Sequence, residues 1–126
     1  SARDVQQGRG GQWFLGKNLQ GSCPMGPWLV SVDEIPDPQL LDISLRVNGV
    51  VKQHSNTREQ IFPVAQVIAD LSRYLMLDPG DIVITGTPSG VGNARKPPEY
   101  LHPGDVVEAE IQSIGVLRTP IIGPNR

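Results

Sequence analysis

Residues 78–92 constrain the fold more than any other part of this sequence, because a tight turn, a short apolar run and a glycine-rich loop follow one another there. Pro79-Gly80 predicts the turn, since proline fixes φ at the first central position and glycine accepts a positive φ at the second. The run that follows is apolar, rich in β-branched residues and too short for a helix. We therefore expect a central strand over residues 81–85.

The loop at residues 85–92 contains three glycines, two threonines, a serine and a proline. Such a loop can bring backbone N–H groups and hydroxyls close to a small polar ligand, because glycine has no Cβ to block the approach. A surface connection that only turns a corner fits the composition equally well. The loop is not a Walker phosphate loop, because no Gly-Lys-Ser/Thr closes it, and no helical pattern follows it as in a dinucleotide-binding fingerprint.

The remaining patterns predict a mainly β fold with one main helix. Residues 41–47 alternate between apolar and polar, and Asn48-Gly49 is a strong hairpin signal, so residues 50–54 should return antiparallel. Apolar residues recur at helical spacing over residues 63–76, which predicts a helix whose apolar stripe packs in the core. Shorter strands are expected at residues 29–32, 106–111 and 116–122.

Composition limits the kind of protein. A chain of 126 residues is expected to form a single domain, 1–126, large enough to bury a core. Its formal net charge of −2, with both signs mixed along the chain, gives no nucleic-acid footprint. No apolar run approaches the roughly 18–20 residues that span a bilayer, so no membrane partner is expected. The single Cys23 fits a reducing, cytoplasmic compartment.

A few side chains are candidates for chemistry. Lys17 follows Gly16 and an aromatic pair, which suits a partly buried cation with an anionic partner, although a surface lysine is the commoner case. Cys23 has no histidine nearby in sequence and is interpreted as a small buried thiol. Glu108 and Glu110 share one side of a strand, where a solvated outer face is favoured over an acid/base or metal pair.

Two further patterns concern loops. Residues 77–83 and 101–107 both read Leu-x-Pro-Gly-Asp followed by two apolar residues, which predicts two similar corners that each lead into a strand. Residues 8–11 predict a mobile loop, because glycine dominates them.

Several of these stretches together resemble the fumarylacetoacetate hydrolase family, in its order and with its spacing over nearly all of the chain. The resemblance implies a mostly β roll, a homodimer and a divalent-metal enzyme that uses Mg²⁺ or Mn²⁺. It also implies 2-oxo acids or acylpyruvates as substrates, with C–C hydrolysis, decarboxylation, hydration or isomerisation through an enolate as the reaction. The matching residues are Ser-Ala-Arg-Asp-Val-Gln at 1–6, Gly16-Lys17, Gly26-Pro27, Arg-Val-Asn-Gly at 46–49, residues 79–92, Gly104-Asp105 and Ile114-Gly115.

The same resemblance assigns roles to individual residues. Arg3 and Gln6 match the substrate-binding pair of the family's Arg-Asp-x-Gln motif, with Arg3 counted among the catalytic residues. Lys17 matches the catalytic lysine beside the metal. Thr87, with Gly86 before it, matches the threonine that holds the substrate carboxylate or keto oxygen.

The sequence departs from the family pattern at the metal. The family's ligands are a Glu-x-Glu pair and an aspartate just before the stretch at 1–6, so no metal ligand is assigned here and the ligands are expected upstream of Ser1. The chain is accordingly interpreted as the C-terminal part of a protein about twice as long. Two hypotheses stay open: part of a metal-dependent 2-oxo-acid enzyme, or an inactive remnant that keeps the β core and dimer surface as a binding module.

Overall fold

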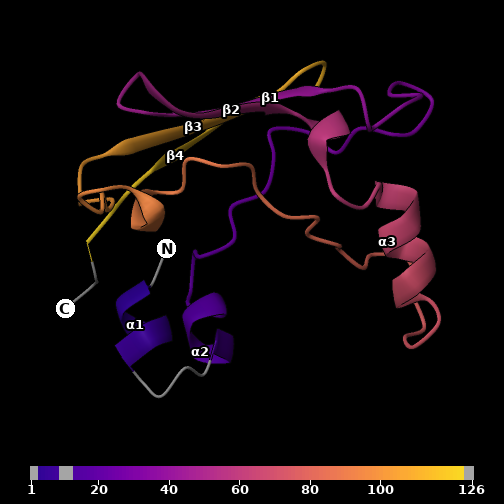
Figure 1. Ribbon diagram of the computed structural model, residues 1–126, viewed down its shortest axis with the longest axis horizontal. Helices are drawn as coiled ribbons and strands as arrows, with labels where there is room; N and C mark the ends of the chain where they lie inside the picture. Colours follow the sequence, from indigo (N-terminus) through magenta and orange to yellow (C-terminus); the bar gives the residue numbers. More distant parts are fainter. Residues whose placement is uncertain (1–2, 9–12, 124–126) are drawn as a thin grey trace.

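The protein is described by a computed structural model that covers residues 3–8 and 13–123. Its central feature is one antiparallel sheet of four strands in the order β2-β1-β3-β4, with β1 and β3 in the middle (Figure 1). The mainly β prediction is therefore confirmed. The strands are β1 (Asp42–Val47), β2 (Val50–Asn56), β3 (Val106–Ile111) and β4 (Gly115–Pro120).

Strands β1 and β2 form the predicted hairpin around Asn48-Gly49. Both turn residues have positive φ, 51° at Asn48 and 78° at Gly49, as a primed hairpin turn requires. The pairing then slips by one residue: Arg46 lies opposite Val51, whereas Leu45 lies opposite Gln53. Lys52 is thus the extra residue of a β-bulge.

The two faces of the sheet differ in chemistry. The inner face carries apolar residues from alternate positions, and the outer face carries charged ones. The inner-face set is Ile43, Leu45, Val47, Val107, Ala109, Ile111 and Leu117; the outer-face set is Ser44, Arg46, Glu108, Glu110 and Arg118. Strand alternation in the sequence predicted this division correctly.

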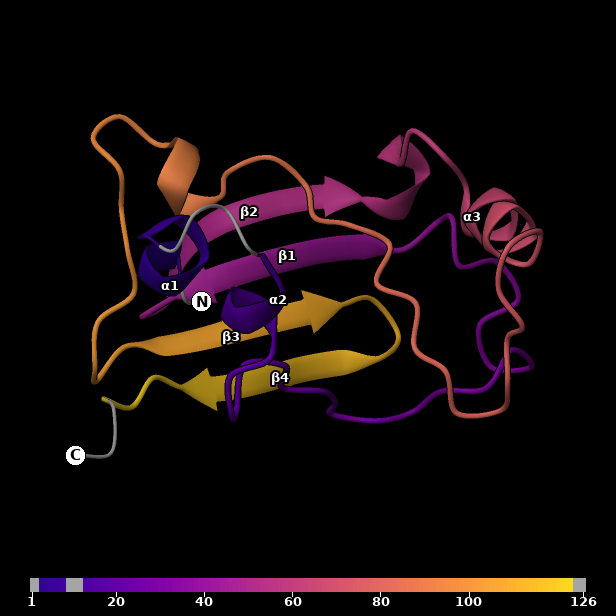
Figure 2. The ribbon, with the colours of Figure 1, turned by 90° about the horizontal axis from the view of Figure 1, so that it is seen from below.

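Two short helices, α1 (Arg3–Gly8) and α2 (Trp13–Lys17), lie side by side on the inner side of the sheet (Figures 1 and 2). A longer helix, α3 (Val64–Leu71), stands at the opposite end. Two 3₁₀ turns, η1 (Thr57–Glu59) and η2 (Gly92–Ala94), complete the elements. No helix in the described ranges is long and apolar enough to cross a membrane.

The helix expected at residues 63–76 is shorter than predicted and ends at Leu71. After it, Ser72 turns its hydroxyl onto the carbonyl of Ile68 at 2.7 Å, and the next residues form a tight turn. Helices α1 and α2 were not predicted, because five or six residues are too few to show a helical period. The loop expected at residues 8–11 lies, apart from Gly8, outside the described residues.

The central strand expected over residues 81–85 is absent from the described sheet. The segment belongs to no strand, and Ile82 and Ile84 are 64% and 78% exposed. The same holds for residues 29–32, where the expected strand does not form. Composition sets the preference for an extended backbone, but a strand also needs a neighbour with which to pair.

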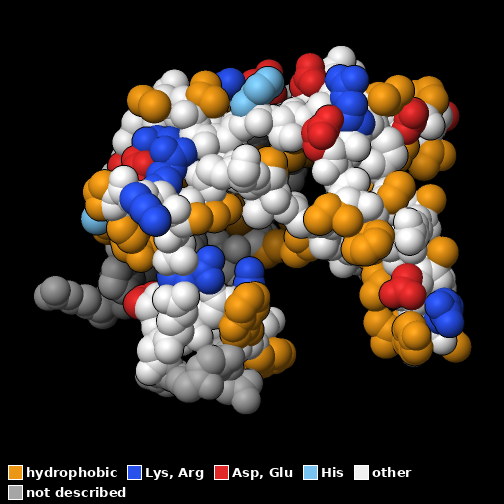
Figure 3. Space-filling view, in the orientation of Figure 1, with side chains coloured by type: hydrophobic (Ala, Val, Ile, Leu, Met, Phe, Trp, Pro, Cys, Tyr) orange, Lys and Arg blue, Asp and Glu red, His pale blue; other side chains and the backbone are white. Residues whose placement is uncertain are grey.

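The expected core is also missing from the described residues: none of their apolar side chains is fully buried. Apolar groups gather on the surface around α3, as the space-filling view shows (Figure 3). The α3 stripe is only partly buried: Val64, Val67 and Leu71 are intermediate in exposure, whereas Ile68 is 43% exposed and Leu75, just beyond the helix, 57% exposed. Cys23, expected to be buried, is exposed. One four-stranded sheet with two short helices on its inner side is too thin to enclose side chains.

We predict that Gly49→Val lowers the free energy of unfolding by about 1–2 kcal/mol, because a branched side chain is strained at this positive φ. A Cβ here would meet no described atom within 4 Å, so the loss reports backbone strain. Gly49→Asn is the matched control and should lose less, since asparagine tolerates the left-handed region. Urea unfolding followed by circular dichroism measures both; equal losses would rule out backbone strain.

Candidate functional site

A cavity of about 1310 Å³ lies between α1, the inner face of the sheet and the segment that leads into β3. Helix α1 contributes Arg3 and Asp4, and β2 contributes Lys52 and Gln53. The segment before β3 contributes Arg95, Glu99, His102 and Asp105. The cavity lining therefore combines apolar side chains with charges of both signs.

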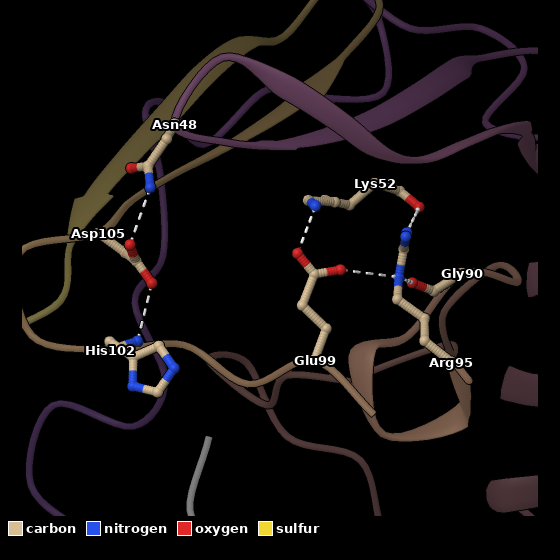
Figure 4. A network of polar contacts seen from close by, with 7 residues as sticks. All are labelled: Asn48, Lys52, Gly90, Arg95, Glu99, His102 and Asp105. Carbon is tan, nitrogen blue, oxygen red and sulfur yellow. Dashed lines mark hydrogen bonds and ion pairs between the residues drawn. The ribbon is translucent and has the colours of Figure 1, made fainter. Parts of the chain in front are cut away.

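The β-bulge brings two polar residues of β2 into this cavity. Lys52 and Gln53 are neighbours in sequence and would point to opposite faces of a regular strand, yet both line the cavity. Lys52 forms an ion pair with Glu99, and Arg95 lies 3.5 Å from the other carboxylate oxygen (Figure 4). Glu99 thus joins strand β2 to the loop that follows η2.

The corner that leads into β3 is closed by Asp105. Its carboxylate accepts a hydrogen bond from the backbone N–H of His102 at 2.7 Å and one from the Asn48 amide at 2.8 Å (Figure 4). The related corner has the same internal bond, from the N–H of Asp78 to Asp81 at 2.9 Å. The predicted similarity of the two Pro-Gly-Asp corners is confirmed, but only the second leads into a strand.

These contacts lower the pKa of two carboxyl groups. The hydrogen bond from Lys52 holds the pKa of Glu99 below its ordinary value of 4.5. The bond from the His102 backbone, followed by the one from Asn48, lowers the pKa of Asp105 from 3.8. Both carboxylates therefore stay ionised at neutral pH.

We predict that these two carboxyl groups make the free energy of unfolding depend on pH in the acid range. A carboxyl whose pKa is lower when folded stabilises the fold above its ordinary pKa, and this stabilisation is lost as the pH falls below about 4.5 towards the lowered values. The melting temperature of Glu99→Gln/Asp105→Asn should therefore be lower than wild type at pH 7 and approach it at pH 3. A constant difference across this range would contradict the assignment.

Helices α1 and α2 meet at a close contact between Gln6 and Gly16. A Cβ on Gly16 would lie 2.7 Å from the Cβ of Gln6, so only glycine fits. Gln6 is 6% exposed, and its Nε2 has no hydrogen-bond partner in the described structure. A buried amide without a partner is costly unless a ligand supplies one. Arg3 lies one turn before Gln6, and exposed Lys17 follows Gly16 directly.

We predict that Gly16→Ala destabilises the packing of α1 against α2 by about 1–3 kcal/mol, the usual range for overpacking. Alanine normally favours a helix over glycine, so a loss here would show that the contact with Gln6 decides the outcome. Gly8→Ala is the matched control, because a Cβ at Gly8 meets no atom of the described residues within 4 Å. Hydrogen exchange of the α1 amides should rise in Gly16→Ala only; unchanged exchange would contradict the contact.

The glycine-rich loop is held against strand β2. Gln53 Nε2 donates to the Pro88 carbonyl at 2.7 Å and to Thr87 Oγ1 at 3.0 Å. A Cβ on Gly90 would come within 2.3 Å of the Lys52 carbonyl, and one on Gly92 within 2.0 Å of the Glu99 carbonyl. Two of the loop's glycines therefore admit the protein's own backbone, whereas Gly86, with φ 109°, faces open space.

The structure brings together some of the predicted site residues. Arg3 and Gln6 share α1, and Lys17 lies on the adjoining α2, whereas Gly86 and Thr87 lie on the loop beside β2. Of the five, only Arg3 lines the cavity among the described residues. Sequence reasoning missed the polar residues that organise the site, because neither the bulge nor the ion pairs leave a local sequence signal. These residues are Lys52, Gln53, Arg95 and Glu99.

The outer-face carboxylates are not arranged for a metal. Glu110 accepts a hydrogen bond from Arg46 at 2.7 Å, and Glu108 lies between Arg46 and Arg118 at 3.7 and 3.9 Å. The described ranges contain no group of three His, Cys, Asp or Glu side chains that could hold a metal ion. These residues therefore do not fit a divalent cation by themselves.

Comparison with known proteins identifies the family. The sequence model described as fumarylacetoacetate (FAA) hydrolase C-terminal matches residues 1–122. The chain is 49% identical over 122 residues to the mitochondrial oxaloacetate tautomerase Fahd2a of Rattus norvegicus, covering 97% of this chain and 39% of that protein. The chain belongs to the fumarylacetoacetate hydrolase family. It spans about two fifths of the length of such relatives.

Solved structures agree with this assignment. A fumarylacetoacetate hydrolase from Exiguobacterium antarcticum superimposes with a TM-score of 0.93 at 40% identity, over 98% of this chain and 44% of that one. A maleylpyruvate hydrolase from Sphingobium sp. SYK-6, in complex with manganese(II) and pyruvate, gives 0.72 at 37% identity, over 80% and 36%. The expected fold family is thus confirmed, while the cytoplasmic location stays a prediction.

Proposed function

We propose that this chain forms part of an enzyme that acts on small 2-oxo acids or acylpyruvates through an enolate. The observation that carries the proposal is the family match over residues 1–122. The names of its relatives support it, since oxaloacetate and maleylpyruvate are both 2-oxo acids. Hydrolysis, decarboxylation and tautomerisation of such acids share one requirement, the stabilisation of negative charge on an oxygen next to the reacting carbon.

The residues of α1 and α2 suit this requirement. In the proposal, Arg3 binds the substrate carboxylate, because its planar guanidinium can donate two parallel hydrogen bonds. The amide of Gln6, one turn away and without a partner among the described residues, donates to a neighbouring oxygen of the substrate. Lys17 supplies the positive charge that stabilises the developing enolate. Thr87 and the open backbone at Gly86 hold the keto or carboxylate oxygen from the side of the loop.

A divalent cation, Mg²⁺ or Mn²⁺, and a homodimer also belong to the proposal for the whole enzyme. The manganese-bound relative supports the cation. The described residues do not on their own supply its ligands. Exposed apolar groups such as Phe62 and Leu75 support burial against a further protein surface.

The test is a hybrid protein in which residues 1–122 replace the matching segment of the rat oxaloacetate tautomerase. We expect the hybrid to accelerate keto–enol interconversion of oxaloacetate, which is followed by the ultraviolet absorbance of the enol. A folded hybrid without activity on oxaloacetate, maleylpyruvate or related 2-oxo acids would leave the binding-module hypothesis in its place.

Within the hybrid, we predict that Lys17→Ala lowers kcat by about 100-fold or more, the usual effect of losing one preorganised charge. Lys17→Arg should not restore the rate, because a planar fork does not replace a compact ammonium group. Lys96→Ala removes a lysine outside the proposed machinery and serves as the matched control. A near-normal rate in Lys17→Ala would show that Lys17 is only a surface residue.

A further inference from the structure

The hydrogen-bond partners of Gln53 determine which end of its side-chain amide, the nitrogen or the oxygen, faces the loop. Its Nε2 lies 2.7 Å from the Pro88 carbonyl oxygen, 3.0 Å from Thr87 Oγ1 and 3.3 Å from the Ser89 carbonyl oxygen. Carbonyl oxygens only accept hydrogen bonds, so the nitrogen of the amide, and not its oxygen, must face the loop. The Thr87 hydroxyl is therefore an acceptor from Gln53.

This direction leaves the proton of Thr87 uncommitted. A hydroxyl has one proton and two acceptor positions, and Gln53 uses an acceptor position only. Among the described contacts no group accepts the Thr87 proton, and the residue is exposed. The hydroxyl is thus prepared to donate to an incoming oxygen atom.

We propose that Gln53 is a positioning residue that sets Thr87 as a hydrogen-bond donor to the substrate. Its two amide protons go to the two nearer acceptors, Thr87 Oγ1 and the Pro88 carbonyl, so it fixes the loop and turns the hydroxyl proton outward. The acceptor is a carboxylate or keto oxygen of a 2-oxo acid. The β-bulge makes this possible, because it places Gln53 on the loop side together with Lys52. The inference rests on the proposed function of Thr87 as a substrate-binding residue.

A second clamp on the same loop provides an internal control. Arg95 Nε donates to the Gly90 carbonyl at 3.2 Å, and Arg95 Nη2 donates to the Lys52 carbonyl at 2.7 Å (Figure 4). This clamp holds the far end of the loop and makes no contact with Thr87. Loosening the loop at Arg95 and removing the donor at Gln53 are therefore separable changes.

The experiment is a double-mutant cycle in the hybrid enzyme with oxaloacetate as substrate. Gln53→Met keeps the size of the side chain and removes its donor, so KM should rise about fivefold to tenfold, the effect of one oriented hydrogen bond. Thr87→Val should raise KM similarly. Adding Gln53→Met to Thr87→Val should change KM no further, whereas Arg95→Met should multiply the effect of Thr87→Val. Thr87→Ser keeps the hydroxyl and should keep the dependence on Gln53.

Independent, multiplying effects of Gln53→Met and Thr87→Val would overturn the inference, because Gln53 would then act only on loop structure. An unchanged KM in Gln53→Met would also overturn the inference. If the wild-type hybrid shows no turnover, the proposed function is contradicted instead. The role of Gln53 is then tested by NMR of its side-chain amide in the 126-residue chain. Its NMR signals should exchange slowly with solvent and shift in Thr87→Val; free exchange and no shift would overturn the clamp.

Discussion

The register slip between β1 and β2 is the constraint on which the site depends. Without the extra residue, Lys52 and Gln53 would lie on opposite faces of the sheet, and one of them would point away from the cavity. With it, Lys52 reaches Glu99 while Gln53 reaches Thr87. One irregular residue therefore fixes two segments, before and after η2, to the same strand.

In the glycine-rich loop, different glycines serve close packing and an open surface. Gly90 and Gly92 are needed where the loop approaches the carbonyls of Lys52 and Glu99. Gly86 has a positive φ, and a Cβ added there would meet none of the described residues within 4 Å, so this side of the loop is open in the part of the chain that the structure describes. The loop is thus both a structural clamp on β2 and an open edge, two roles that its composition alone presents as alternatives.

The sequence predicts the hairpin, the division of the sheet into two faces and the two Pro-Gly-Asp corners, because each depends on neighbours in the chain or on strand alternation. It does not predict that residues 81–85 remain unpaired, since pairing depends on another part of the fold. The site follows the same rule. Motif residues such as Arg3 and Thr87 can be proposed from the sequence alone, whereas Glu99 and Gln53 matter only through contacts that span 47 and 34 positions.

The charged outer face has a consequence for assembly. Arg46, Glu108, Glu110 and Arg118 form a ladder of ion pairs across the strands, and charged side chains of both signs gather on the sheet side of the molecule in Figure 3. A second layer that stacked there would have to remove water from each of these ion pairs. The attraction between the paired charges would not compensate for the free energy of that desolvation. The ladder therefore makes the sheet one-sided, so that any further layer is directed to the inner, apolar surface.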